Sequence, residues 1–190
     1  MMNLLNLGKM PFSFHGGWDT VSKIHPSVIR SFLLLVLPCS LIPPLALLYA
    51  GSHHAALYWV DAPYLRWLDV AAVFLIMELM TVPLMGWLIR KLAKDHQVTM
   101  DFQDSFLLAS ITAVPMWLSS LGLLSADLWL VIACVIMGLL LAASVLYHGL
   151  YAILKLEDTV DAQVMGYKIF SFGGIVWIML CSFVALPLMW

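Results

Sequence analysis

Long runs of apolar residues alternate with short polar connectors along the chain. A helix that crosses a bilayer needs roughly 20 predominantly apolar residues. Runs of this kind predict five membrane-spanning helices, at 31–50, 69–89, 105–124, 128–154 and 169–190. Since none of the runs alternates with a period of two, a β-barrel is not supported. A helix satisfies its own backbone hydrogen bonds in lipid, so we predict an all-α membrane protein, a bundle of five transmembrane helices.

The residues before the first run predict a cytoplasmic N-terminal segment, 1–30, in front of a single transmembrane domain, 31–190. Its apolar side chains recur at every third or fourth position, at Trp18, Val21, Ile24 and Val28. This spacing is typical of a short amphipathic helix that lies in the membrane interface.

Composition agrees with a membrane protein and excludes other classes. The chain is 63% hydrophobic and 11% charged, whereas ordinary globular domains are about 45–50% apolar and about 25% charged. A soluble domain and a disordered chain are therefore excluded. The net charge of -2 does not favour nucleic acid as a partner. The expected surrounding is a lipid bilayer.

The basic residues predict the orientation of the chain, because cytoplasmic loops carry an excess of lysine and arginine. The chain has nine lysine and arginine residues. Eight of them lie on one predicted side of the membrane: Lys9, Lys23, Arg30, Arg90, Lys91, Lys94, Lys155 and Lys168. Arg66 alone lies on the other side. We therefore expect a cytoplasmic N-terminus and a C-terminus outside the membrane.

Glu78 is the most unusual residue of the predicted spans. It lies near the middle of the second span, where a carboxylate costs about 2.5–3.5 kcal/mol on insertion scales. Its side chain should therefore face the interior of the bundle. One interpretation is a site for protons, cations or polar lipid headgroups, and the other is a neutral carboxyl that hydrogen-bonds a neighbouring helix.

His148 is a further candidate for a polar site within the membrane, and Ser144 lies one turn before it on the same helix face. Ser144 is placed to orient the imidazole. A histidine whose hydrogen bonds are satisfied at a helix interface explains the same residues.

Four prolines fall inside predicted spans and are candidates for helix breaks: Pro43, Pro44, Pro83 and Pro115. Each removes a backbone donor and frees a carbonyl about one turn earlier, so several helices should be kinked. Broken helices that meet an acidic residue near the midplane form the sites of many transporters. Proline is also simply commoner in membrane helices than in soluble ones.

Small residues form a seam along the fourth span, at Gly138, Ala142 and Gly149. Such a seam lets a second helix approach closely. It is equally compatible with packing inside one chain and with a homo-oligomer.

No motif for catalysis or metal binding is present: the sequence contains neither G-x-S-x-G nor H-E-x-x-H, and no phosphate-binding loop. The three cysteines lie singly in different spans and form no C-x-x-C pair. We therefore expect no enzyme, no metal and no cofactor.

The order of these features resembles the Yip domain family (Ypt/Rab-interacting proteins), in particular its small bacterial inner-membrane branch. The segments that carry the resemblance are His25-Pro26, Pro38, Ile42-Pro43-Pro44, Tyr49-Ala50-Gly51 and Leu146-Tyr147-His148-Gly149. The resemblance implies five helices, a cytoplasmic N-terminus and a bacterial inner membrane. Eukaryotic relatives act in vesicle traffic and bind prenylated small GTPases, but their signature motifs are not clearly present, so the resemblance gives little support for GTPase binding.

Two functions follow as hypotheses. The first is a non-enzymatic multi-pass protein that organises membrane partners, a second copy included, or bilayer shape. The alternative is a small transporter or permeation protein for protons, cations or lipid headgroups that uses Glu78.

Overall fold

The computed structural model describes Trp18 and residues 25–58, 60–96, 98–154 and 160–189. Within this part of the chain every regular element is helical. The elements are α3 (Val28–Ser31), η2 (Phe32–Val36), α4 (Leu37–Ser40), α5 (Ile42–His53), η3 (Ala55–Tyr58), α6 (Tyr64–Asp95), α7 (Phe102–Ser119), η4 (Ser120–Leu124), α8 (Leu128–Leu154) and α9 (Val160–Met189). They form five spans that are long and apolar enough to cross a membrane. The predicted fold class is confirmed.

Two helices run beyond the apolar stretches that predicted them. α6 has 32 residues and is therefore about 48 Å long, which exceeds the roughly 30 Å of a hydrocarbon core. α9 begins at Val160 instead of 169, so part of the predicted connector is helical. Helix formation does not stop where hydropathy falls: good helix formers such as Lys91 and Lys94 continue α6, and the α9 helix includes Gln163 but also Gly166.

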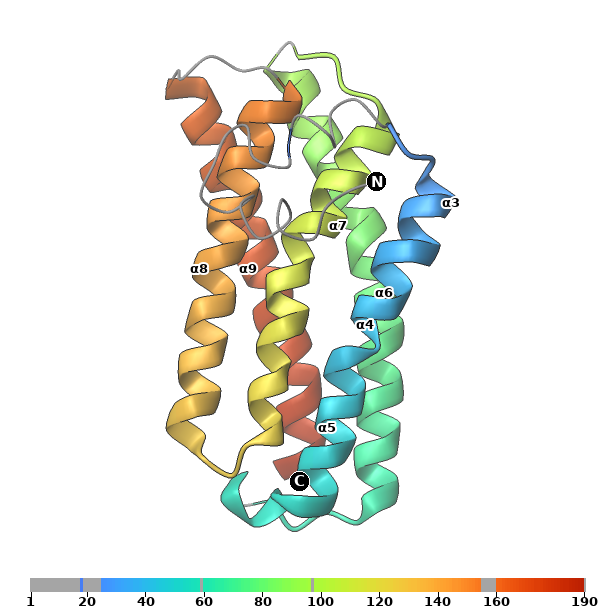
Figure 1. Cartoon of the computed structure of the whole chain (residues 1–190), viewed down its shortest axis with the longest axis vertical. Coiled ribbons are helices and arrows are strands. Elements are labelled where there is room, and N and C mark those ends of the chain that lie inside the picture. Colours follow the sequence, from blue (N-terminus) through green and yellow to red (C-terminus); the bar gives the residue numbers. More distant parts are fainter. Residues whose placement is uncertain (1–17, 19–24, 59, 97, 155–159, 190) are drawn as a thin grey trace.

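The first span is interrupted at its prolines. η2 is a short π-helical segment directly before α4, which carries Pro38 in its first turn. The helix then breaks at Leu41, and Pro43 and Pro44 lie in the first turn of α5. Figure 1 shows α4 and α5 as successive segments of this span. Because neither proline has a backbone N–H, two successive intrahelical hydrogen bonds are lost here.

The other two candidate prolines do not interrupt their helices. α6 continues through Pro83 and α7 continues through Pro115. A single proline removes one hydrogen bond, and the flanking turns of each helix carry on.

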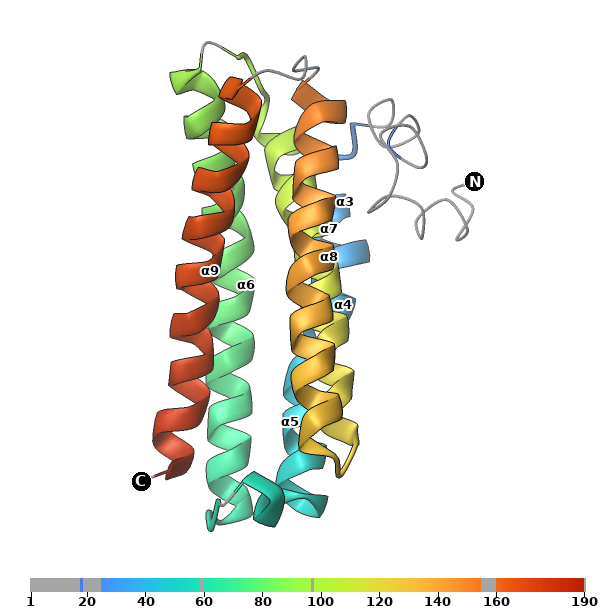
Figure 2. The same cartoon turned by 90° about the vertical axis from the view of Figure 1, so that its left-hand side faces the viewer.

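The helices pack as two groups that run lengthwise beside each other. α6 and α9 form one group, and α7 and α8 lie opposite them with α3–α5 behind (Figure 2). α6 contacts α5, α7 and α9, whereas α9 packs extensively on α6 and only lightly on α8. α3 begins near one end of the bundle and α9 finishes at the other (Figure 1).

α7 and α8 approach each other closely at the predicted small-residue seam. A Cβ atom at Gly138 would lie 2.6 Å from Ser119 Cβ and 3.0 Å from the Pro115 carbonyl oxygen. A Cβ atom at Gly149 would overlap Leu108 and Trp18. Ala142, between them, is buried. The seam is thus occupied within the chain.

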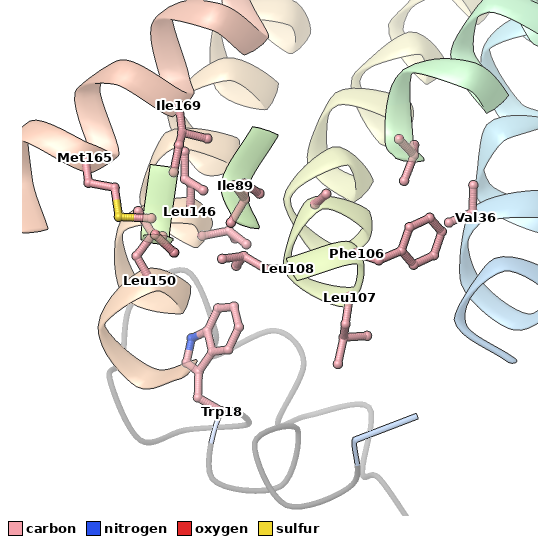
Figure 3. Close-up of a cluster of buried hydrophobic side chains, with 14 of the residues drawn as sticks. Trp18, Val36, Ile89, Phe106, Leu107, Leu108, Leu146, Leu150, Met165 and Ile169 are labelled. Carbon is pink, nitrogen blue, oxygen red and sulfur yellow. The ribbon is translucent and has the colours of Figure 1, made fainter. Parts of the chain in front are cut away.

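Trp18 packs against the end of this bundle. Its side chain is fully buried in a cluster with Leu108, Leu150 and Ile169, which come from α7, α8 and α9 (Figure 3). The sequence also predicted three other apolar positions for an interfacial helix, and the structure describes only one of them. Val21 and Ile24 lie outside the described residues, and Val28 begins α3.

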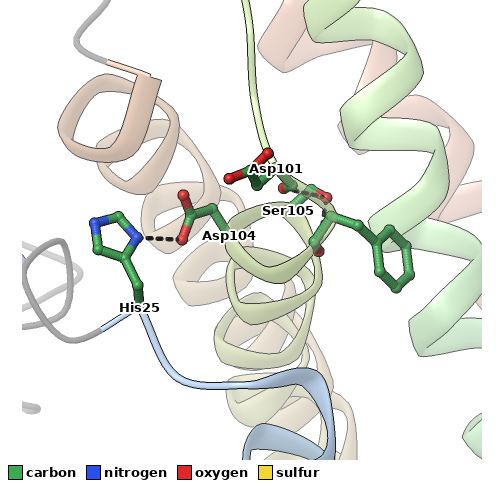
Figure 4. Close-up of polar contacts among 5 residues, drawn as sticks. His25, Asp101, Asp104 and Ser105 are labelled. Atoms are coloured by element: carbon green, nitrogen blue, oxygen red, sulfur yellow. Dashed lines mark hydrogen bonds and ion pairs between the residues drawn. The ribbon is translucent and has the colours of Figure 1, made fainter.

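A polar contact joins the residues before α3 to the start of α7. His25 Nδ1 donates a hydrogen bond to Asp104 Oδ1 at 2.8 Å (Figure 4). His25 has a positive φ of 39°, which histidine adopts more readily than most residues. Ser105 Oγ donates to the Asp101 carbonyl at 3.2 Å in the same turn. The His25–Asp104 contact holds the residues before α3 against the start of α7.

Candidate functional site

Glu78 lies in the middle of α6 and faces the interior of the bundle, with 7% of its surface exposed. The Trp117 side chain on α7 is positioned to donate a hydrogen bond to its carboxyl group. The second oxygen, Oε2, is buried and has no hydrogen-bond partner among the described residues. Leaving a buried polar atom without a partner costs about 1–3 kcal/mol.

A cavity of about 140 Å³ lies beside this carboxyl. Residues of α6, α7, α8 and α9 line it. They include Glu78, Thr81, Thr112, Trp117, Ala142, Gly173, Gly174 and Trp177. Most of the wall is apolar, and the described residues that line it include no lysine, arginine or histidine.

Thr112 supplies a second unsatisfied polar atom to the same cavity. Its Oγ1 is buried and has no hydrogen-bond partner among the described residues. Thr81, on the opposite wall, differs because its Oγ1 donates to the Met77 carbonyl at 2.8 Å. The cavity therefore contains two polar atoms, Glu78 Oε2 and Thr112 Oγ1, that have no hydrogen-bond partner in the part of the chain that the structure describes.

Comparison with known proteins identifies the family. A family model described as the Yip1 domain matches residues 11–186, which is most of the chain. The chain belongs to the Yip1 domain family. No curated protein and no solved structure matches it.

The cavity of this Yip1-domain protein does not include the other polar candidates. His148 Nδ1 donates a hydrogen bond to the Ser144 carbonyl oxygen at 2.7 Å, and Ser144 Oγ lies 3.4 Å from the same nitrogen. The Tyr147 ring packs edge-on to the imidazole. Neither His148 nor Ser144 lines the cavity beside Glu78.

None of the four candidate prolines lines the cavity, although Pro115 lies between residues that do. Pro115 lies on α7 between Thr112 and Trp117, so the Ile111 carbonyl loses its usual donor at this level of the helix. Pro83 is on the Glu78 helix but does not line the cavity, and Pro43 and Pro44 do not line it either.

Sequence reasoning missed Thr112 and the cavity-lining glycines of α9. The available signal for Thr112 was a hydroxyl three residues before a proline inside an apolar span. The sequence does not single out Trp117 or Trp177 as residues of this cavity, because an indole within an apolar run gives no indication of what its N–H faces. The described residues contain no group of three or more side chains suited to a metal ion.

Proposed function

We propose that this Yip1-domain protein has a non-enzymatic role, in which it organises partner membrane proteins or bilayer shape. The observation that supports this is the arrangement of α9. Of the five spans, α9 buries the smallest share of its most apolar window inside the chain, and it packs chiefly on α6. Most of its surface is therefore free to contact lipid or another membrane helix.

Site-specific cross-linking in native membranes tests this role. A photoreactive amino acid at Ile178, which is 60% exposed on α9, is expected to give discrete cross-linked protein products. Met80, which is 67% exposed on α6, provides the matched position on another helix and should give fewer. A chain that stays monomeric and forms no product from either position contradicts the proposal.

We also propose a bacterial inner membrane as the location, with the N-terminus in the cytoplasm. The charge distribution supports this orientation: Arg90, Lys91 and Lys94 at the end of α6 and Lys168 near the start of α9 lie at the end of the bundle where α3 begins (Figure 1). Arg66 lies at the opposite end.

The orientation predicts the behaviour of reporter fusions. A phosphatase that is active only outside the cytoplasm should be active when fused after Trp190, because the C-terminus is expected outside. A fluorescent protein that matures only in the cytoplasm should stay dark at the same position. The reverse pair of results would overturn the orientation.

The Glu78 cavity favours a second candidate function, the permeation of protons, cations or lipid headgroups. Under this hypothesis Glu78→Gln abolishes flux into liposomes, because the neutral amide keeps the shape but cannot exchange a proton or bind a cation. Asp69→Asn is the matched control, since Asp69 is an exposed carboxylate on the same helix, and it should leave flux unchanged.

Two results would exclude permeation. One is normal flux through the Glu78→Gln variant when its thermal unfolding in detergent matches that of the wild type. The other is the absence of flux through the wild-type protein for all three substrate classes.

A further inference from the structure

We propose that the cavity between α6, α7, α8 and α9 binds a neutral amphiphile, a molecule with a hydrocarbon body and a single hydroxyl or carbonyl oxygen. This binding site goes beyond the partner-organising role and requires no flux. Three properties of the cavity support it: its unsatisfied polar atoms, the chemistry of its wall, and its connection to the hydrocarbon of the bilayer.

The polar atoms are placed to hold one small polar group. Glu78 is 93% buried, since 7% of its surface is exposed, and Oε2 has no partner among the described residues. Thr112 Oγ1, on the facing helix, is buried and likewise has no hydrogen-bond partner within the described ranges. A neutral carboxyl and a hydroxyl can each donate and accept a hydrogen bond, so together they suit a ligand hydroxyl or carbonyl.

The wall chemistry argues against charged ligands. Among the residues that the structure describes, no lysine, arginine or histidine lines the cavity, so these residues would give an anionic headgroup no countercharge. Calcium takes six to eight oxygen ligands and magnesium requires near-octahedral coordination. The side chains of the wall offer one carboxyl group and the hydroxyls of Thr81 and Thr112, and the first hydroxyl is already donated to Met77.

The cavity is connected to the membrane interior on the side of α9. Gly173 and Gly174 line it there, and a Cβ atom at Gly174 would meet no other atom within 4 Å. Phe170, also on the wall, is 37% exposed. α9 packs only lightly on α8. A ligand can therefore enter sideways from the hydrocarbon.

The volume fits the polar end of such a ligand. An apolar cavity of about 150 Å³ holds a benzene molecule, and this one measures about 140 Å³. The polar group and the first carbons would fill it. The remaining hydrocarbon chain would then lie between α8 and α9, among lipid tails.

Photolabelling of the purified full chain in phosphatidylcholine liposomes tests the site. The probes are three hexadecyl chains with the same diazirine group, which end in a hydroxyl, a trimethylammonium or a methyl group. The hydroxyl probe is expected to label peptides of α7 and α9 that line the cavity, and the other two should label them less. Stronger labelling by the ammonium probe would overturn the proposal in favour of a cation site.

Two variants test the polar contact with the ligand and the entrance to the cavity separately. Thr112→Val removes the unpartnered hydroxyl at nearly constant shape, and the loss of one hydrogen bond should reduce labelling about 2–10-fold. Gly174→Leu fills the open side and should abolish cavity labelling. Both should fold, since the first removes an unsatisfied group and the second extends into open space, and thermal unfolding in detergent checks this.

Thr81→Val is the matched control, because the Thr81 hydroxyl is already bonded within its own helix; its labelling should equal that of the wild type. The proposal fails if Thr112→Val and Gly174→Leu label like the wild type. It also fails if the hydroxyl probe labels no better than the methyl probe, in which case water fills the cavity. Since the readout is labelling, neither result bears on the partner cross-links of α9.

Discussion

Replacing Trp18 by alanine is expected to lower the free energy of unfolding by about 3–5 kcal/mol, the range for deleting a large aromatic side chain from a packed site. Trp18 is fully buried and packs on Gly149. Gly149 has no side chain that could move into the space left by the deleted indole ring. That space therefore cannot be filled by a rearrangement of Gly149. Denaturation in mixed detergent micelles, followed by near-ultraviolet circular dichroism, measures the change.

Two further variants define this effect. Trp129→Ala removes the same side chain from a position that is 80% exposed, and it should change stability by less than about 0.5 kcal/mol. Trp18→Phe keeps part of the ring volume and should fall between alanine and the wild type. Equal effects of Trp18→Ala and Trp129→Ala would show that Trp18 does not stabilise the bundle.

Replacing Gly138 by alanine is expected to destabilise the bundle by about 1–3 kcal/mol, because an added methyl group overpacks the contact between α7 and α8. The new Cβ would lie 2.6 Å from Ser119 Cβ and 3.0 Å from the Pro115 carbonyl oxygen. A backbone carbonyl cannot turn away as a flexible side chain can, so the two helices must separate. The same micelle denaturation experiment reports the loss.

Gly174→Ala is the matched control for this substitution. A Cβ atom there would meet no other atom within 4 Å, and alanine favours a helix interior over glycine by about 0.5–1 kcal/mol. The control variant should therefore be as stable as the wild type or slightly more stable. If Gly138→Ala behaves like Gly174→Ala, α7 and α8 are not in close contact at Gly138.

Hydropathy predicts the number and order of the spans because the cost of exposing polar groups to lipid acts on each helix separately. It does not predict where a helix ends in water. Tyr64 and Asp95 end α6 well beyond the apolar residues 69–89, since backbone hydrogen bonding and helix propensity continue outside the hydrocarbon.

Adjacent prolines and single prolines have different outcomes that residue type alone does not predict. Pro43 and Pro44 remove two successive donors and coincide with a break at Leu41. Pro83 and Pro115 each remove one, and α6 and α7 continue through them. The packing around each helix contributes to this difference, and the packing is not visible in one sequence.

The residues of the candidate site were also only partly predictable from the sequence, because they depend on helix packing. The inward orientation of Glu78 follows from the energetic cost of a carboxyl group in lipid. Its neighbours depend on how the helices rotate and shift against each other. His148 was also a polar candidate, but it does not line the cavity, whereas Thr112 and Trp117 are among the residues that share it with Glu78.

The position of Trp18 has a consequence for the order in which the molecule assembles. Trp18 is synthesised before any of the five spans, but it packs on Gly149 and Leu108, which belong to the fourth and third. Contacts between residues so distant in sequence form late, because a long loop must first close. Trp18 therefore stays undocked while the first spans enter the membrane, and its burial marks the completion of the α7–α8 pair.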